Sequence, residues 1–170
     1  VSLENIKKCI TNKTIAIIVV HFAGLPCDMN KISKFCKRRN IKIIEDSAET
    51  LGAKINGKYT GSFGIGCFSF FPTKNITTTE GGMLTTENEK IYSYVKKLIA
   101  HGIDKDIKRK FWHRVAVLPG HNFRMPNHLA AIGYSQLKRI EKFNRARNKI
   151  ANLYNSELSK PFYKINIPYI

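Results

Sequence analysis

Three polar residues occupy positions in this sequence from which they could act on one ligand. Asp46 follows the apolar run IKIIE, Ser69 lies within the run CFSFF, and Lys74 lies in the loop SFFPTKNITTTEGG. A lysine amine can attack a carbonyl or bind an anion, a carboxylate can keep a basic nitrogen protonated, and a hydroxyl can bind phosphate. These residue types are therefore the starting point for a functional interpretation.

Three interpretations of Lys74 and Asp46 follow from the residues alone. In the first, they form a structural ion pair, or Lys74 is simply a solvated lysine on a loop. In the second, Lys74 and the nearby hydroxyl groups bind a phosphate, although the P-loop spacing G-x-x-x-x-G-K-S/T is absent. In the third, the lysine amine condenses with the aldehyde of pyridoxal phosphate, Asp46 keeps the pyridine nitrogen protonated and Ser69 binds the phosphate.

The elements that must position these residues are predicted as a parallel α/β arrangement. The β-branched run 14–20 and the run 41–45 read as buried strands, and between them Asp28 caps a helix that extends to about residue 39. A strand–helix–strand unit with short links makes the two strands parallel. Because such sheets bind ligands beyond the carboxyl ends of their strands, Asp46 and Lys74 are expected at the same edge.

Further elements are predicted on both sides of this unit. A short helix begins after Ser2, strands are expected at 67–71 and 81–86 with an antiparallel return between them, and Thr86 with Glu89 forms a capping box for a helix to about residue 100. Residues 51–64, which are rich in glycine, and 101–120 read as loops. One long helical pattern covers 127–158, and another strand is expected from Ile165 onward.

Composition restricts the possible functions only weakly. The chain has 170 residues and a formal net charge of +17, which suits an anionic partner, but the basic residues are scattered and carry no recognised nucleic-acid-binding motif. The four cysteines form no C-x-x-C pair and do not cluster with histidines, so we predict reduced thiols and no metal site. No apolar run is long enough to span a bilayer.

Three segments carry a resemblance to a known family. They are VHFAGLPCDM, IIEDSAETLGAKINGKYTGSFGIGCFSFFPTKNITTTEGGM and GHNFRMPNHLAAIGYSQLKRI, which contain E-D-x-A, S-F-x-x-x-K, E-G-G and N-F-R-M in that order. In these motifs the chain resembles the DegT/DnrJ/EryC1/StrS family, which are pyridoxal-phosphate-dependent aminotransferases acting on nucleotide-linked keto-sugars. The resemblance covers Val1 to about Leu158.

The resemblance implies a role for each matching residue near the cofactor. Lys74 corresponds to the lysine that binds pyridoxal phosphate covalently and moves the proton during transfer. Asp46 corresponds to the acid that pairs with the pyridinium nitrogen, Ser69 to the hydroxyl that binds the phosphate, and Glu49 to a residue beside the ring substituents. A branch of the family that dehydrates sugars has His in place of the lysine, so Lys74 favours transamination.

Two more matching residues imply a shared active site. Asn122 corresponds to an asparagine that reaches across a homodimer interface to the partner's cofactor phosphate, and Arg124, in the same loop, is expected to hold an anionic group of a substrate. Two departures from the family pattern are Phe71, where many members have His or Asn, and Thr79, which replaces a glycine. The change at Thr79 removes no reacting group.

The resemblance also implies a fold and a division of the chain. We expect an α/β fold, namely part of the fold type I (aspartate aminotransferase-like) large domain, with a mostly parallel sheet flanked by helices. Residues 1–125 are expected in this cofactor-binding domain, 126–160 in a long connecting helical region and 161–170 at the start of a truncated small domain.

The functional prediction is an aminotransferase, or the central fragment of one. It would transfer an amino group, expected to come from glutamate, to a nucleotide-linked keto-sugar in the cytoplasm. The alternative is a truncated chain that keeps the fold without the chemistry, because family members are roughly twice as long. A third hypothesis, a nucleic-acid-binding module, depends on the +17 charge alone.

Overall fold

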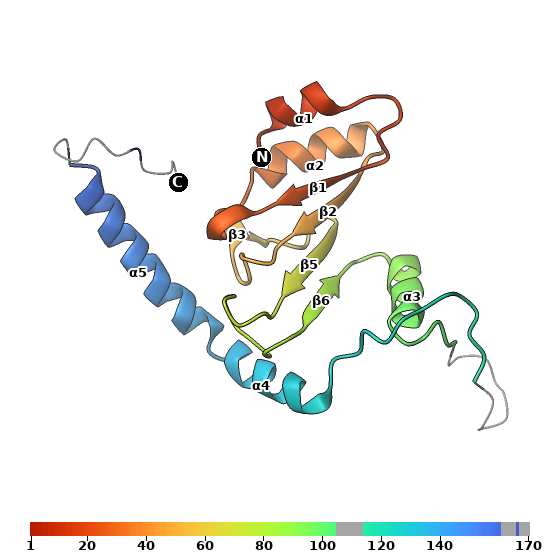
Figure 1. Ribbon diagram of the computed structural model, residues 1–170. Coiled ribbons are helices and arrows are strands. Elements are labelled where there is room, and N and C mark those ends of the chain that lie inside the picture. The colour runs from red at the N-terminus through yellow and green to blue at the C-terminus, as the bar shows by residue number, and fades with distance from the viewer. Residues whose placement is uncertain (105–113, 161–165, 167–170) are drawn as a thin grey trace.

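The computed structural model describes residues 1–104, 114–160 and 166. Its centre is a four-stranded sheet in the order β1-β2-β5-β6 (Figure 1). The strands are β1 (Ala16–Val20), β2 (Lys42–Asp46), β5 (Ile65–Ser69) and β6 (Gly82–Thr85). β1, β2 and β5 are parallel, and β6 returns antiparallel to β5. The predicted strand–helix–strand unit and the antiparallel return are therefore confirmed.

One face of the sheet is covered by α1 (Leu3–Cys9) and α2 (Met29–Arg38). Each helix begins where the sequence supplies a cap: Ser2 accepts a hydrogen bond from the backbone of Asn5, and Asp28 accepts one from that of Lys31. The apolar side chains of these helices meet those of β1 and β2 in the main core. That core consists of Ile6, Val19, Met29, Ile32, Cys36, Ile41 and Ile43.

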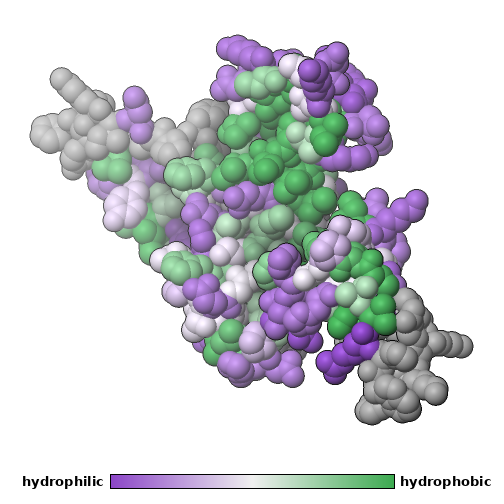
Figure 2. Space-filling model, turned by 45° about the vertical axis from the view of Figure 1, so that its right-hand side comes forward, coloured by the Kyte–Doolittle hydropathy of each residue, from purple (hydrophilic) through white to green (hydrophobic). Residues whose placement is uncertain are grey.

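The opposite sheet face and the rim of the molecule are less covered. Side chains alternate along a strand, so Ile18 and Val20 point away from the core that contains Val19, and both are exposed. Figure 2 shows apolar side chains gathered across one face of the molecule. On β6, the exposed Leu84 pairs with Cys67 and so lies on the same sheet face as Ile18 and Val20. Parallel sheets normally have both faces covered, whereas this face leaves apolar side chains exposed.

Smaller elements complete the description. They are the 3₁₀ turn η1 (Phe22–Gly24), the hairpin of β3 (Lys54–Ile55) and β4 (Lys58–Tyr59), and the helices α3 (Glu89–Leu98), α4 (Asn127–Leu137) and α5 (Ile140–Leu158). The hairpin lies within residues 51–64, which were predicted to be loop. The third and fourth strands each differ from their predicted bounds by one or two residues.

Three sequence predictions are corrected here. Asp46 is the last residue of β2 and does not follow the strand. The cap of α3 is Asn88 and not Thr86, because the Asn88 side chain accepts hydrogen bonds from the backbone of Lys90 and Ile91. The strand expected from Ile165 onward lies outside the described residues, apart from residue 166, which is in no strand.

The long helix predicted at 127–158 is in fact two helices. α4 ends at Leu137 and α5 begins at Ile140, and the two run in different directions in Figure 1. Arg139 closes the turn, because its backbone N–H donates to the carbonyl of Gln136 over 2.9 Å. Neither glycine nor proline marks this break, so the hydrophobic pattern continued across it.

Among the described residues, no helix combines the length and apolar character needed to cross a membrane.

Candidate active site

Lys74 and Glu49 meet at the edge of the sheet. Nζ of Lys74 donates to Oε1 of Glu49 over 3.2 Å, and the two residues are 25 positions apart in the sequence. The lysine side chain is 21% exposed and the glutamate side chain 40%, so the pair is open to a ligand. The sequence predicted that both residues lie near one cofactor, and the structure brings them into direct contact.

Glu49 is itself fixed by the backbone of η1. Its second oxygen, Oε2, accepts a hydrogen bond of 2.7 Å from the N–H of Ala23. This backbone hydrogen bond and the one from Lys74 lower the pKa of Glu49 below its usual value of 4.5. A carboxylate held in this way stays ionised at neutral pH, and it points the lysine amine toward the strand ends.

Asp46 and Ser69 project from one face of the sheet. Asp46 pairs in register with Cys67 on the neighbouring strand, and Ser69 lies two residues beyond Cys67, so alternation places all three side chains on the same face. Oδ1 of Asp46 accepts from the N–H of Ala48 over 3.1 Å. The hydroxyl oxygen of Ser69 accepts from the N–H of Phe71 over 3.3 Å, which keeps it at the start of the lysine loop.

The lysine loop, residues 70–81, is closed by short backbone contacts. The N–H of Lys74 donates to the carbonyl of Phe71, and the N–H of Thr78 donates to that of Phe70, each over 3.0 Å. The hydroxyl of Thr77 donates to the same Phe70 carbonyl over 2.9 Å. Hydroxyl residues of this loop therefore hold its shape around Lys74.

Asn122 and Arg124 lie on a separate segment. Nε of Arg124 donates to the side-chain oxygen of Asn122 over 3.0 Å, and its guanidinium also lies 3.4 Å from the ring of His101. Together with Met125, Pro126 and Asn127 they line an open hollow of about 350 Å³. Both side chains are exposed.

Glu45 and His21 form a buried support that sequence reasoning missed. Both side chains are inaccessible, and Nε2 of His21 lies 3.1 Å from Oε2 of Glu45. The N–H of Cys27 donates to Nδ1 of His21, so the ring's proton is on Nε2 and is donated to the carboxylate. Glu45 also accepts from the N–H of Gly61 and of Phe63, over 2.9 and 2.7 Å.

The position of Glu45 was a signal for this support. A glutamate inside a buried β-branched run must be paired, because an unpaired charge there is too costly. Alternation then separates the two acids of the E-D motif: Glu45 points toward the core with Val19, and Asp46 points to the other face, where a ligand can reach it.

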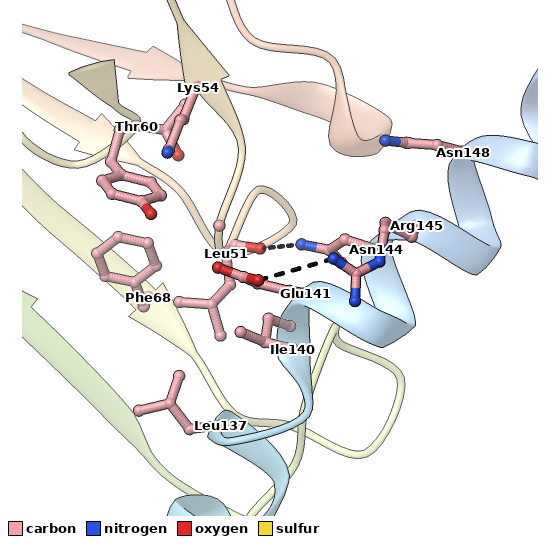
Figure 3. Close-up of a pocket in the computed structure, with 12 residues that line it drawn as sticks. Leu51, Lys54, Thr60, Phe68, Leu137, Ile140, Glu141, Asn144, Arg145 and Asn148 are labelled. Carbon is pink, nitrogen blue, oxygen red and sulfur yellow. Dashed lines mark hydrogen bonds and ion pairs between the residues drawn. The ribbon is translucent and has the colours of Figure 1, made fainter. Parts of the chain in front are cut away.

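A larger hollow of about 500 Å³ lies between α5 and the β3–β4 hairpin (Figure 3). It is lined by apolar residues such as Leu51, Phe68 and Ile140 and crossed by a hydrogen bond from Asn144 to the Leu51 carbonyl. Its lining includes none of the six predicted site residues. The predicted site residues at the strand-end edge therefore lie outside this larger hollow.

The donor set at the edge fits pyridoxal phosphate. An amine, together with an acid on the same sheet face as a hydroxyl, matches the aldehyde, the pyridine nitrogen and the phosphate of that cofactor. In the part of the chain that the structure describes, no three His, Cys, Asp or Glu residues cluster as metal ligands would.

Comparison with known proteins gives a consistent result. The chain is 43% identical over 159 residues to GDP-perosamine synthase of Escherichia coli O157:H7, which covers 93% of this chain and 42% of that protein. It is 39% identical over 160 residues to GDP-perosamine synthase of Vibrio cholerae, covering 94% and 42%. The chain thus spans less than half the length of these relatives.

Solved structures agree with the fold. The aminotransferase from Psychrobacter cryohalolentis superposes with a TM-score of 0.89 at 34% identity, covering 94% of this chain and 42% of that one. The GDP-4-keto-6-deoxy-D-mannose-3-dehydratase of E. coli, with bound hydrated pyridoxal phosphate, gives 0.86 at 33%, covering 95% and 45%. The predicted α/β fold, the mostly parallel sheet of fold type I, is confirmed.

The motifs, the fold and the site agree with the result of the sequence comparison, in which the family's sequence model matches residues 1–167. The chain belongs to the DegT/DnrJ/EryC1/StrS aminotransferase family.

Proposed function

We propose that this protein is a pyridoxal-phosphate-dependent aminotransferase that transfers an amino group, from glutamate, to a nucleotide-linked keto-sugar in the cytoplasm. The observation that carries the proposal is Lys74, held 3.2 Å from Glu49 at the strand edge where Asp46 ends β2. The dehydrating branch of this family has histidine at the position of Lys74, so the lysine favours amino transfer. The relatives named GDP-perosamine synthase support a nucleotide-linked sugar as the substrate class.

Each residue of the edge has one task in this proposal. When bound, the cofactor supplies an electron sink for the carbanion formed at the substrate carbon. Asp46 holds the proton on the pyridine nitrogen that makes this possible, and Ser69 binds the phosphate. Lys74 supplies the nucleophilic Nζ and, once released, carries the proton to and from the substrate carbon.

Glu49 orients the reacting amine. With its pKa lowered by the Ala23 N–H and by Lys74, it stays a carboxylate and accepts a hydrogen bond from Nζ. We assign it the task of holding Nζ at the edge before the cofactor arrives and of lying beside the ring substituents afterwards.

The second half of the proposal is a homodimer with shared sites. Asn122, whose exposed side-chain oxygen accepts from Nε of Arg124, would bind the phosphate of the partner's cofactor, and Arg124 would hold an anionic group of a substrate. Residues 1–125 would belong to the cofactor domain, 126–160 to the connecting helices and 161–170 to the start of a small domain.

Covalent labelling tests the cofactor assignment. The protein expressed from its complete reading frame is mixed with pyridoxal phosphate, reduced with borohydride and digested, and the label is located by peptide mass. We expect the label on Lys74, its loss in Lys74→Ala, and a strong reduction in Asp46→Ala and Ser69→Ala. Lys149, on α5, provides an internal control for surface reaction. Equal labelling of Lys74 and Lys149 would refute the assignment.

Complementation tests the shared site. Lys74→Ala and Asn122→Ala homodimers are each inactive under the proposal, but a mixed dimer contains one site with both residues intact. After equal amounts are mixed and the subunits exchange, about half of the dimers should be mixed, and each of these has one intact site. The restored activity is measured as formation of pyridoxamine phosphate after glutamate is added. If Asn122 acts within its own subunit, the mixture stays inactive.

A further inference from the structure

The lysine loop is attached to the helices α4 and α5 by contacts that bridge long sequence separations. The N–H of Thr77 donates to Oε1 of Gln136 over 3.2 Å, and Nε2 of Gln136 donates back to the Thr77 carbonyl over 2.7 Å. One side-chain amide thus pairs with both backbone groups of a residue 59 positions away. This is the pairing that a strand partner would provide, supplied here by a helix.

A second contact holds the same loop at Asn75, the residue that follows Lys74. Nη2 of Arg147, on α5, donates to the carbonyl of Asn75 over 3.0 Å, and Nη1 of the same guanidinium donates to Asn144 over 3.2 Å. Asn144 in turn donates to the Leu51 carbonyl over 2.9 Å (Figure 3). The loop of Lys74 and the segment that follows Glu49 are therefore tied to one helix.

Close packing leaves the loop little freedom beside these bonds. Gly133 of α4 lies against Thr78, and a β-carbon at this glycine would come within 2.6 Å of the Thr78 methyl. Ile76 and Thr78 are buried. Thr77 lies between these two buried residues, and both of its backbone groups pair with Gln136. Gln136 therefore helps to set how far the loop extends toward the sheet edge.

We propose that Gln136 is a positioning residue that fixes Lys74 opposite Glu49, so that the lysine amine is held where it captures the cofactor. The inference rests on the proposed function of Lys74 as the cofactor-binding lysine. Gln136 itself touches neither the amine nor a ligand. Misplacement of a reacting group by about 1 Å is enough to slow a reaction severely, which makes a distant anchor of the loop matter.

Two substitutions separate this role from a general effect on folding. Gln136→Met keeps the length of the side chain and removes both hydrogen bonds. Gln136→Glu keeps the shape, but as a carboxylate it can accept from the Thr77 N–H and cannot donate to the Thr77 carbonyl. When protonated, the same carboxyl has one O–H donor and an acceptor and so restores both bonds. Ser135→Ala, an exposed neighbour on α4, is the matched control.

The measurement is the rate of pyridoxal phosphate capture at Lys74, trapped with borohydride and divided by capture at Lys149. We expect Gln136→Met to capture about tenfold more slowly than wild type at every pH and Ser135→Ala to equal wild type. Relative to wild type at the same pH, Gln136→Glu should be slow at about pH 8 and recover toward wild type at about pH 5, where the introduced carboxyl gains its proton.

A purely structural effect would not follow this proton. Backbone hydrogen exchange of residues 70–81, measured without cofactor, should become faster in Gln136→Met and stay unchanged in Ser135→Ala. Capture in Gln136→Met equal to that in Ser135→Ala, or a Gln136→Glu rate ratio independent of pH, would overturn the inference. If wild type itself shows no preference for Lys74, the proposed function fails instead, so the two failures are distinguishable.

Discussion

Gly133→Ala tests the packing that holds the lysine loop. Gly133 is buried inside α4, and its added methyl would lie 2.6 Å from Cγ2 of Thr78, about an ångström closer than carbon atoms pack. Thr78 cannot easily turn away, because it is 1% exposed and its hydroxyl donates to the Glu80 carbonyl over 2.8 Å. Gly133→Ala therefore has two opposing effects on stability: alanine favours the helix more than glycine does, and its methyl clashes with the Thr78 methyl.

The two effects have comparable sizes and opposite signs. In an open helix position, replacing glycine with alanine stabilises the folded state by about 1 kcal/mol. Forcing one extra methyl into a packed interior costs about 1–3 kcal/mol. Gly133→Ala should therefore lower the free energy of unfolding by about 0–2 kcal/mol, with the net loss appearing only because Thr78 carries its methyl.

The double mutant isolates the contact. Thr78→Ser removes the methyl and keeps the hydroxyl that bonds Glu80, so in this background Gly133→Ala should raise the free energy of unfolding by about 1 kcal/mol. The four proteins of the cycle are compared by urea denaturation, and the coupling energy should be about 1–3 kcal/mol. A Gly133→Ala effect of the same sign and size in both backgrounds would refute the argument that α4 packs directly on the loop.

Three further predictions follow from other contacts. Glu45→Ala leaves the buried N–H of His21 and the backbone N–H groups of Gly61 and Phe63 without their acceptor, so it should lower the free energy of unfolding by about 3–5 kcal/mol in urea denaturation. Lys31→Ala, which breaks only an exposed ion pair, should leave that free energy almost unchanged. The pKa of Glu49 is lowered in the folded state, so its ionised form stabilises the fold above about pH 4.5, and this stabilisation is lost as the pH falls through the folded-state pKa. Glu49→Gln should therefore flatten the acid side of a plot of unfolding free energy against pH, and an unchanged plot would contradict this. Asn88→Ala removes the cap of α3 and should cost about 1 kcal/mol by the same assay, while an effect below about 0.3 kcal/mol would argue against that cap.

The buried Glu45 explains how one motif serves two purposes. In the E-D pair, Glu45 ties β2 to His21 after β1 and to the backbone of Gly61 and Phe63 before β5. It thereby ties the carboxyl ends of β1 and β2 to the segment that enters β5. Asp46, the next residue, is carried to the ligand side of the same edge, so the geometry of the site depends on a support hidden directly behind it.

The sequence by itself determined the local features of this protein. Runs of β-branched residues set the strands, Ser2 and Asp28 set two helix starts, and the short links made β1 and β2 parallel. Because parallel strands end at one edge, the positions of Asp46 and Lys74 near that edge also followed. All of these depend on residues close together in the chain, where propensity and spacing act directly.

Only the tertiary structure decided the contacts between distant segments. The break between α4 and α5 has no glycine or proline to announce it. The cap of α3 moved to Asn88 because the helix began two residues later than the pattern suggested, and the hairpin at 54–59 paired residues that read as loop. In each case neighbouring sequence was compatible with more than one local conformation, and packing selected among them.

The anchoring of the lysine loop is the clearest example. Gln136 carries no sign in the sequence that it will meet Thr77, 59 residues earlier, and Glu49 none that it will meet Lys74. A hydrogen bond depends on two groups arriving at one point in space, and that point is defined by the whole sheet and the helices around it. Residue types can indicate which chemistry is available, but only the folded chain determines which groups meet to perform it.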